Sequence, residues 1–246
     1  LRGLGVQALE GFTLDSGTGT VDIKGLSNSD HAIWLGYNAG GVGPSSIAIT
    51  SASTAATAIT IHGESTINYA GFGVNWDASV GNSRVLIQST ASSGGGVSIT
   101  GINNGMSNGI ILGRLGTNQP IQILSQAGDI SLISSAAIYI HGHDAFLGNR
   151  KNGDAVNGVT PSVQNSTADI LIRANSMNDG AGADFVVSTT GSFTFEPYDS
   201  AWSTADIGGQ LDVSGSFADN NFTGGVTDAA WLEIKGVSGL TGLTFG

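Results

Sequence analysis

The chain has 246 residues, of which 39 are glycine, 40% are hydrophobic and only 11% are charged. Its 8 Lys and Arg against 19 Asp and Glu give a formal net charge of -11, which disfavours nucleic acid and anionic membrane surfaces as partners. The absence of cysteine excludes a disulfide framework and a thiolate metal site, and no stretch approaches the roughly 18 apolar residues of a membrane span.

Short runs of alternating apolar and small or polar residues recur along the whole chain, and glycine, serine or asparagine separates them. Runs of four or five residues with period two predict strands with one buried and one solvent-exposed face rather than helices. The expected strands begin near Phe12, Val21, Ile33, Ile47, Ile59, Phe72, Val85, Val97, Ile110, Ile121, Ile130, Ile138, Ile170, Phe185, Phe193, Leu211, Trp231 and Leu243. The expected core includes Ile49, Ile59, Ile61, Ile123, Leu132, Ile138 and Ile140.

Several of these runs match one another at a nearly constant sequence offset, which indicates an internal duplication. The matches are VDIKGL from Val21 with VSITGI from Val97, AIWLG from Ala32 with GIILG from Gly109, Pro44 with Pro120, and AITIHG from Ala58 with AIYIHG from Ala137. The repeating unit, about 76 residues from Val21 to Val97, predicts about three turns of roughly 25 residues each. The fold class is therefore an all-β parallel β-solenoid of about ten rungs with loop excursions. The pairs Ile33/Ile110 and Ile61/Ile140 should each share a face.

The chain divides into three parts on this interpretation. Residues 1–148 form a solenoid with the duplication, over about 12–80 and 85–155, and residues 168–246 form a more divergent continuation. Residues 149–167 (NRKNGDAVNGVTPSVQNST) contain no alternating run and are expected to be a loop or a boundary.

The runs GGGVSITG from Gly94, GDISLISS from Gly128, ADILIRA from Ala168 and GLTGLTFG from Gly239 resemble the repeats of large filamentous-haemagglutinin-like secreted bacterial adhesins. The resemblance covers most of the chain and implies a right-handed β-helix, export, and a role in adhesion or cell-to-cell contact. The family's N-terminal secretion motifs are absent. A shorter stretch, AIWLGYNAGGVGPSSIAIT from Ala32, is similar to the head repeats of trimeric autotransporters.

Two groups of residues are candidates for metal binding. The HGHD stretch contributes His141, His143 and Asp144, and His62 occupies the matching place in the first copy. The DGAGAD stretch contributes Asp179 and Asp184 and partly matches a calcium-binding repeat. Both motifs are incomplete, because a metal needs three or more convergent ligands and a calcium roll needs adjacent repeats. Corner and turn positions explain them without a metal, so no cofactor is expected.

Aromatic residues are the candidates for a binding surface, because flat rings can stack on sugars. They are Trp34, Tyr37, Trp76, Tyr198 and Trp202. Trp34 aligns with Ile111 of the second copy between two inward positions, so we expect it to point outward and to be exposed. Aromatic residues that cover the core or a corner are the alternative.

The sequence shows no catalytic signature. It lacks the G-x-S-x-G, His-Glu-x-x-His and P-loop motifs, and its carboxylates are scattered over turns. We therefore expect no enzyme, but a secreted structural or adhesive module at the bacterial surface that stacks end to end with itself and has neither end capped. A carbohydrate-binding or polysaccharide-cleaving β-helix is the alternative function.

Overall fold

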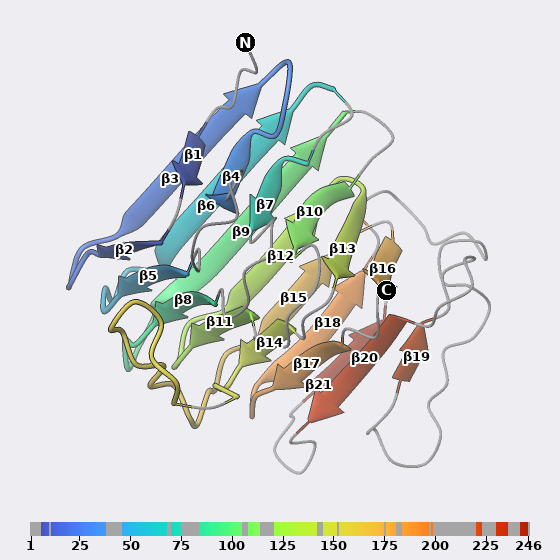
Figure 1. Cartoon of the computed structure of the whole chain (residues 1–246). Coiled ribbons are helices and arrows are strands. Elements are labelled where there is room, and N and C mark those ends of the chain that lie inside the picture. Colours follow the sequence, from blue (N-terminus) through green and yellow to red (C-terminus); the bar gives the residue numbers. More distant parts are fainter. Residues whose placement is uncertain are drawn as a thin grey trace.

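Three parallel β-sheets surround a shared apolar interior in the computed structural model (Figure 1). The structure describes residues 6–9, 11–37, 46–67, 70–74, 84–104, 108–113, 121–141, 145–151, 153–174, 176–180, 184–196, 198, 220–222, 230–235 and 242–245. Within these ranges every regular element is a strand and none is a helix. The predicted all-β solenoid is confirmed.

The strands fall into three sheets, which we call A, B and C. Sheet A contains β1 (Val6–Leu9), β4 (Ile33–Tyr37), β7 (Phe72–Val74), β10 (Asn108–Leu112), β13 (Ala137–His141) and β16 (Ser176–Gly180). Sheet B contains β2 (Phe12–Asp15), β5 (Ile47–Ser51), β8 (Val85–Ser89), β11 (Ile121–Ser125), β14 (Ala145–Gly148), β17 (Asp184–Ser188), β20 (Ala230–Lys235) and β19 (Asn220–Phe222). Sheet C contains β3 (Val21–Ser27), β6 (Thr57–Ser65), β9 (Gly96–Asn103), β12 (Ile130–Ser134), β15 (Ile170–Arg173), β18 (Ser192–Glu196) and β21 (Gly242–Phe245).

From β2 to β18, successive strands visit the three sheets in the constant order B, C, A. The strands β2, β3 and β4 form one turn, and β5, β6 and β7 form the next. Each strand pairs in parallel with its counterpart one turn later, as β3 does with β6 and β6 with β9. The solenoid is therefore built from three-strand turns.

The length of a turn differs from the expectation. Val21, Ile59 and Val97 are in register on neighbouring strands, so one turn leads from Val21 to Ile59 and the next from Ile59 to Val97. The segment from Val21 to Val97 thus contains two turns, each longer than expected, and not three turns of roughly 25 residues. The described parallel strands stack seven deep in sheets B and C and six deep in sheet A. The expected ten rungs are therefore not found in the described part of the chain.

The two matched pairs have different outcomes. Ile33 and Ile110 both pair with Phe72 of the strand between them and lie in sheet A, as predicted. Ile61 lies on β6 in sheet C, whereas Ile140 lies on β13 in sheet A. This second match is wrong. A strand of any of the three sheets can show the same alternation of apolar and polar residues, so the alternation does not identify the sheet.

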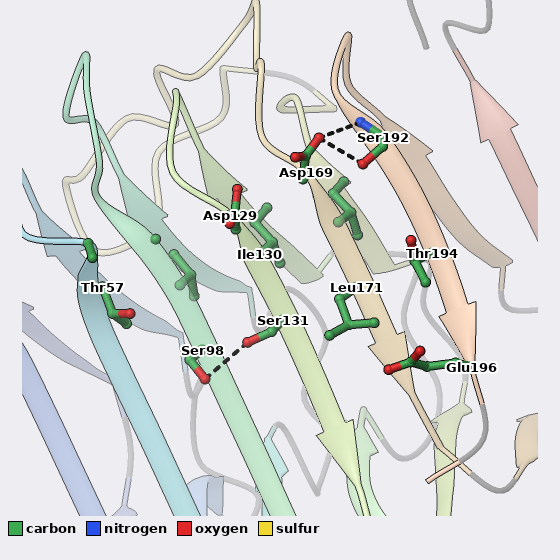
Figure 2. A pocket seen from close by; sticks show the side chains of 14 residues that line it. Thr57, Ser98, Asp129, Ile130, Ser131, Asp169, Leu171, Ser192, Thr194 and Glu196 are labelled. Atoms are coloured by element: carbon green, nitrogen blue, oxygen red, sulfur yellow. Dashed lines mark hydrogen bonds between the residues drawn. The ribbon is translucent and has the colours of Figure 1, made fainter. Parts of the chain in front are cut away.

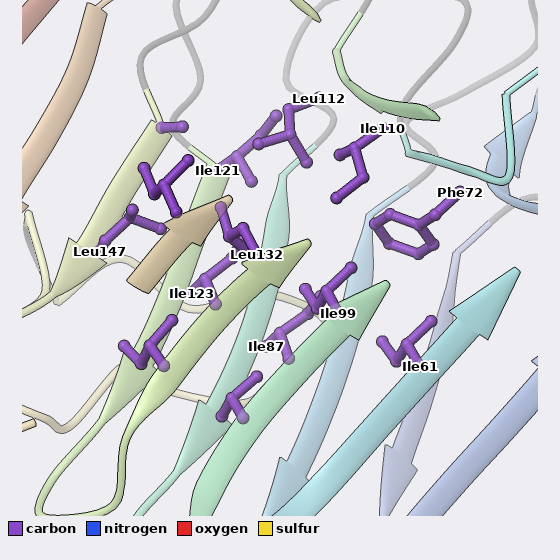
Figure 3. Packing of buried hydrophobic residues seen from close by; sticks show 14 of the residues in the cluster. Ile61, Phe72, Ile87, Ile99, Ile110, Leu112, Ile121, Ile123, Leu132 and Leu147 are labelled. Carbon is purple, nitrogen blue, oxygen red and sulfur yellow. The ribbon is translucent and has the colours of Figure 1, made fainter. Parts of the chain in front are cut away.

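Inward side chains of the three sheets form one continuous apolar core (Figure 3). In sheet B, Ile49, Ile87, Ile123 and Leu147 follow one another in register as a ladder. Every predicted core residue is confirmed, with at most 1% of its surface exposed: Ile49, Ile59, Ile61, Ile123, Leu132, Ile138 and Ile140. Burial of a large aliphatic side chain contributes about 1.5–3 kcal/mol, so these ladders supply most of the driving force for folding.

The outer face of sheet B is covered by residues 149–151 and 153–167, which we call the strap (yellow in Figure 1). A second buried apolar cluster joins the strap to outward positions of β5, β8 and β11, through Ala48, Leu86, Leu124, Val156 and Val163. All five residues of each of these strands are therefore buried. The expectation of a solvent-exposed outer face is wrong for this part of sheet B.

Polar side chains of sheet B also hold the strap. Gln122 accepts a hydrogen bond from the backbone N–H of Lys151 at 2.9 Å, and Gln88 accepts one from the N–H of Ser162 at 3.1 Å. These two glutamines are 1% and 4% exposed. They satisfy strap amides that would otherwise lose water without gaining a partner, which would cost about 1–3 kcal/mol each.

The two ends of the solenoid differ. At one end sheets B and C stop at β2 and β3, and no described residue pairs with their outer edges. Leu14 and Leu26 on these strands are 37% and 67% exposed. At the other end no residue of the described part pairs with the outer edge of β21 in sheet C, but β19 pairs antiparallel with β20 and covers the edge of sheet B. The expectation that no segment covers either end therefore does not hold for sheet B.

Candidate functional site

An open groove with a volume of about 560 Å³ crosses the outer face of sheet C (Figure 2). Its lining comes from five consecutive strands of the sheet, β6 to β18, and from the residues just before them. The groove therefore runs across the strands and along the axis of the solenoid. Neighbouring strands lie about 4.8 Å apart, so the four steps from β6 to β18 give a length of roughly 19 Å.

The middle of the groove carries one outward side chain from each of four strands. Ser98, Ser131, Leu171 and Thr194 are in register on β9, β12, β15 and β18. They point outward because their neighbours in sequence, such as Ile130 beside Ser131, are buried in the core. The Ser131 hydroxyl and the Ser98 hydroxyl are hydrogen-bonded at 3.0 Å. We call these four residues the hydroxyl row, although Leu171 gives it one apolar position.

A second row lies at the start of the same strands. Asp129, Asp169 and Ser192 each precede the first inward residue of β12, β15 and β18, and Thr57 occupies this place on β6. Asp169 Oδ1 accepts hydrogen bonds from the backbone N–H and the hydroxyl of Ser192, at 2.7 and 2.8 Å. On β9 the position is Gly96, where an added Cβ would lie 2.9 Å from the Asp129 carbonyl oxygen. Backbone alone therefore lines that point of the groove.

The charge of the groove is negative. Asp129, Asp169 and Glu196 line it, and no lysine or arginine is among its described lining residues. Arg173, on the strand next to Glu196, forms an ion pair with that carboxylate. The lining thus presents hydroxyls and carboxylates as hydrogen-bonding groups, which do not attract an anionic ligand.

These groove residues were not among the candidates predicted from the sequence. Their only signal in the sequence is a serine or threonine at the second position of a strand, as in VSIT from Val97 and ISLI from Ile130. Such residues are common on any solvated strand. Only the stacking of strands that are distant in sequence, such as β12 on β15 and β15 on β18, brings them into rows.

Trp34, a candidate for the binding surface, lies on the outer face of sheet A as expected but is buried, with 2% of its surface exposed. Its ring covers Gly73 of the neighbouring strand, where an added Cβ would lie 2.1 Å from the indole. The His31 ring lies against it, with the ring centroids 3.9 Å apart. The expectation of an exposed tryptophan is therefore wrong. Glycine has no side chain, so the indole packs directly over the backbone of Gly73.

Of the other aromatic candidates, Tyr198 lies two residues beyond β18 and is 37% exposed. Tyr37 is the last residue of β4, and its side chain lies outside the described part of the structure. Trp76 and Trp202 also lie outside the described residues.

The metal candidates lie on different sheets. His141 ends β13 and Asp179 lies on β16, both in sheet A, whereas Asp184 begins β17 in sheet B. His143 and Asp144 lie outside the described residues. His62 lies on β6 in sheet C, so its proposed equivalence with His141 is wrong. Among the described residues, no three His, Asp or Glu side chains are grouped so that they could hold a metal ion.

Comparisons of the chain with protein-family models, with curated proteins and with solved structures found no match. None of the elements in the described ranges is a helix long and apolar enough to cross a membrane.

Proposed function

We propose that the chain is a secreted structural or adhesive module that forms part of a rigid extracellular rod and mediates cell-surface or cell-to-cell contact. The observation that carries this proposal is the edge formed by β2 and β3, with which no residue in the described ranges pairs. The low charge, the glycine-rich composition and the resemblance to filamentous-haemagglutinin-like repeats support it. The right-handed sense of the coil belongs to the same proposal. It assigns the chain no catalytic role, cofactor or metal.

The edge of β3 is suited to continue the solenoid. Its other edge is in register with β6 over seven positions, from Val21 to Ser27, so the strand is extended and regular along its whole length. Free backbone groups on such an edge can pair with a further parallel strand. Leu26 and Leu14 add exposed apolar surface beside these backbone groups.

A second copy of the chain is the partner that fits this edge. In its own sheet C no described residue pairs with the outer edge of β21, whereas its sheet B is covered by the antiparallel β19. The contact would therefore join β3 of one copy to β21 of the next. A head-to-tail contact of this kind uses two different surfaces and does not close on itself, so it generates filaments.

Sedimentation analysis over a range of protein concentrations, with electron microscopy of the same samples, tests the proposal. The proteins are the native chain and the variants Leu26→Glu and Thr90→Glu. We expect the native chain to form rods that lengthen with concentration, and Leu26→Glu to remain shorter because it places a carboxylate at the contact.

Thr90→Glu is the matched control, because it adds the same charge at an exposed residue directly after β8, a central strand of sheet B. It should form rods as the native chain does. A native chain that stays monomeric at every concentration would contradict the proposed self-association.

A further inference from the structure

The groove across sheet C points to a ligand, and we propose that it binds an extended, neutral polysaccharide chain lying along the axis of the solenoid. This inference goes beyond the structural role proposed above and does not depend on end-to-end stacking. It rests on the shape of the groove, its hydrogen-bonding groups and its charge.

The shape selects an elongated ligand. The groove is open along roughly 19 Å, and its groups repeat at the strand spacing of about 4.8 Å. That spacing is comparable to the length of one sugar ring in an unbranched chain. A polysaccharide can therefore place successive rings opposite successive strands, whereas a compact ligand would contact only one or two of them.

The chemistry of the two rows matches sugar hydroxyls. Ser131, Ser98 and Thr194 offer hydroxyls that both donate and accept hydrogen bonds, and Asp129 and Asp169 offer carboxylate oxygens that accept them. Among the described residues only Ser192 donates to Asp169, and both of its hydrogen bonds go to Oδ1, so Oδ2 is left for a ligand. A polypeptide is a poorer match, because the backbone of sheet C is already paired on both sides.

The charge selects a neutral chain. Glu196 is ion-paired with Arg173, but Asp129 and Asp169 line the groove with no lysine or arginine among its described lining residues, so a polyuronate, a sulfated glycan or a nucleic acid would be repelled. Leu171 interrupts the hydroxyl row with an apolar side chain. It can pack against the C–H face of a sugar ring, a contact that adds apolar burial without a charge.

The other two outer faces are less suited to this ligand. The strap covers β5, β8 and β11 in sheet B with buried valines. On sheet A, the Trp34 ring lies over Gly73 and packs with Ala70 and Ile111. The indole is therefore buried and cannot stack on a sugar ring. Sheet C combines a groove with outward hydroxyls.

Native gel electrophoresis in the presence of soluble polysaccharides tests the inference. The probes are neutral, unbranched glucan, xylan, mannan and galactan chains, and polygalacturonate as the charged comparison. Fragments of two to eight sugar units then define the length that binds, for which we expect about four units or more from the groove length. We expect at least one neutral polysaccharide to retard the native chain, and polygalacturonate not to.

Ser131→Arg and Thr194→Arg fill the groove from two different strands and should weaken binding by about tenfold or more, the effect of losing one or two polar contacts. Thr100→Arg is the matched control, since Thr100 lies on β9 of the same sheet but does not line the groove. Circular dichroism shows whether each variant is folded, and if one arginine variant is not, the other carries the test.

Three results would overturn the inference. The first is a native chain that none of the neutral polysaccharides retards. The second is retardation that both folded groove variants retain in full. The third is retardation that a chelator abolishes, since the groove would then be a cation site and not a sugar site.

Discussion

The side-chain amide of Asn157 donates a hydrogen bond of 2.9 Å to the backbone carbonyl of Phe12, which lies 145 residues earlier in the chain. The same amide also donates to the carbonyl of Ser46. Asn157 and Gly158 form the tip of the strap, with φ angles of 49° and 80° in the left-handed region, between the bridged residues Val156 and Val159. The tip of the strap is thus tied to the first strands of sheet B.

Asn157→Gly should loosen the strap. Glycine tolerates the positive φ, so the variant removes the amide without straining the turn. We expect the free energy of unfolding to fall by about 1 kcal/mol, and trypsin to cleave faster after the exposed Lys151 in the strap. Chemical denaturation and timed proteolysis measure the two effects. Ser162→Ala is the control and should leave both unchanged. Equal cleavage rates in native protein and Asn157→Gly would contradict the tether.

Gly73→Ala should destabilise the protein through Trp34. The new Cβ would lie 2.1 Å from the indole, and such overpacking typically costs about 1–3 kcal/mol. Trp34→Leu vacates the space, so the double variant should lose less than the sum of the single losses. Denaturation midpoints of the four proteins measure this coupling. Additive losses would show that the indole does not occupy the space above Gly73.

Ile61→Ala should cost about 2–5 kcal/mol of stability, because it opens a cavity in the ladder between Ile23 and Ile99. Ile140→Ala should cost a similar amount in sheet A. Leu26→Ala is the comparison, since Leu26 is 67% exposed and its truncation should change stability by less than about 0.5 kcal/mol. Urea denaturation measures all three. A midpoint for Ile61→Ala equal to that of the native protein would disprove the inward register of β6.

Asp15 should make stability depend on pH in acid. The backbone N–H of Gly17 at 3.0 Å and the hydroxyl of Thr50 at 2.9 Å both donate to its carboxylate and lower its pKa below the ordinary 3.8. Because the folded state favours the charged form, this contribution is present above the ordinary value and is lost as pH falls through the lowered pKa.

Asp15→Asn should therefore be less stable than the native protein near neutral pH, and the difference should shrink as pH falls below about 4. Thermal denaturation at a series of pH values measures it. Thr50→Val removes one of the two donors and should shift the pH dependence in the same direction by a smaller amount. A difference between native and Asp15→Asn that is constant with pH would rule out this role for the carboxylate.

Most strands and their inward faces could be predicted from the sequence alone. The strands β1, β14, β16 and β19 were not predicted, and the strand expected near Leu211 lies outside the described residues. Alternation such as Val97-Ser98-Ile99-Thr100 is a local property, since a side chain on one face of a strand is followed by a side chain on the other. This local rule was enough to identify the core ladders and the absence of helix among the described residues. It also placed Trp34 correctly on the outer face of its sheet.

Tertiary structure decided everything that depends on how one turn meets the next. Ile61 and Ile140 share nearly the same local sequence but lie on different sheets, because the loops between strands set the length of each turn and those loops carry no periodic signal. The burial of Trp34 required a glycine of the following turn, Gly73, to lie beside it. The groove likewise exists only because stacking aligns Ser98, Ser131 and Thr194 across strands that are distant in sequence.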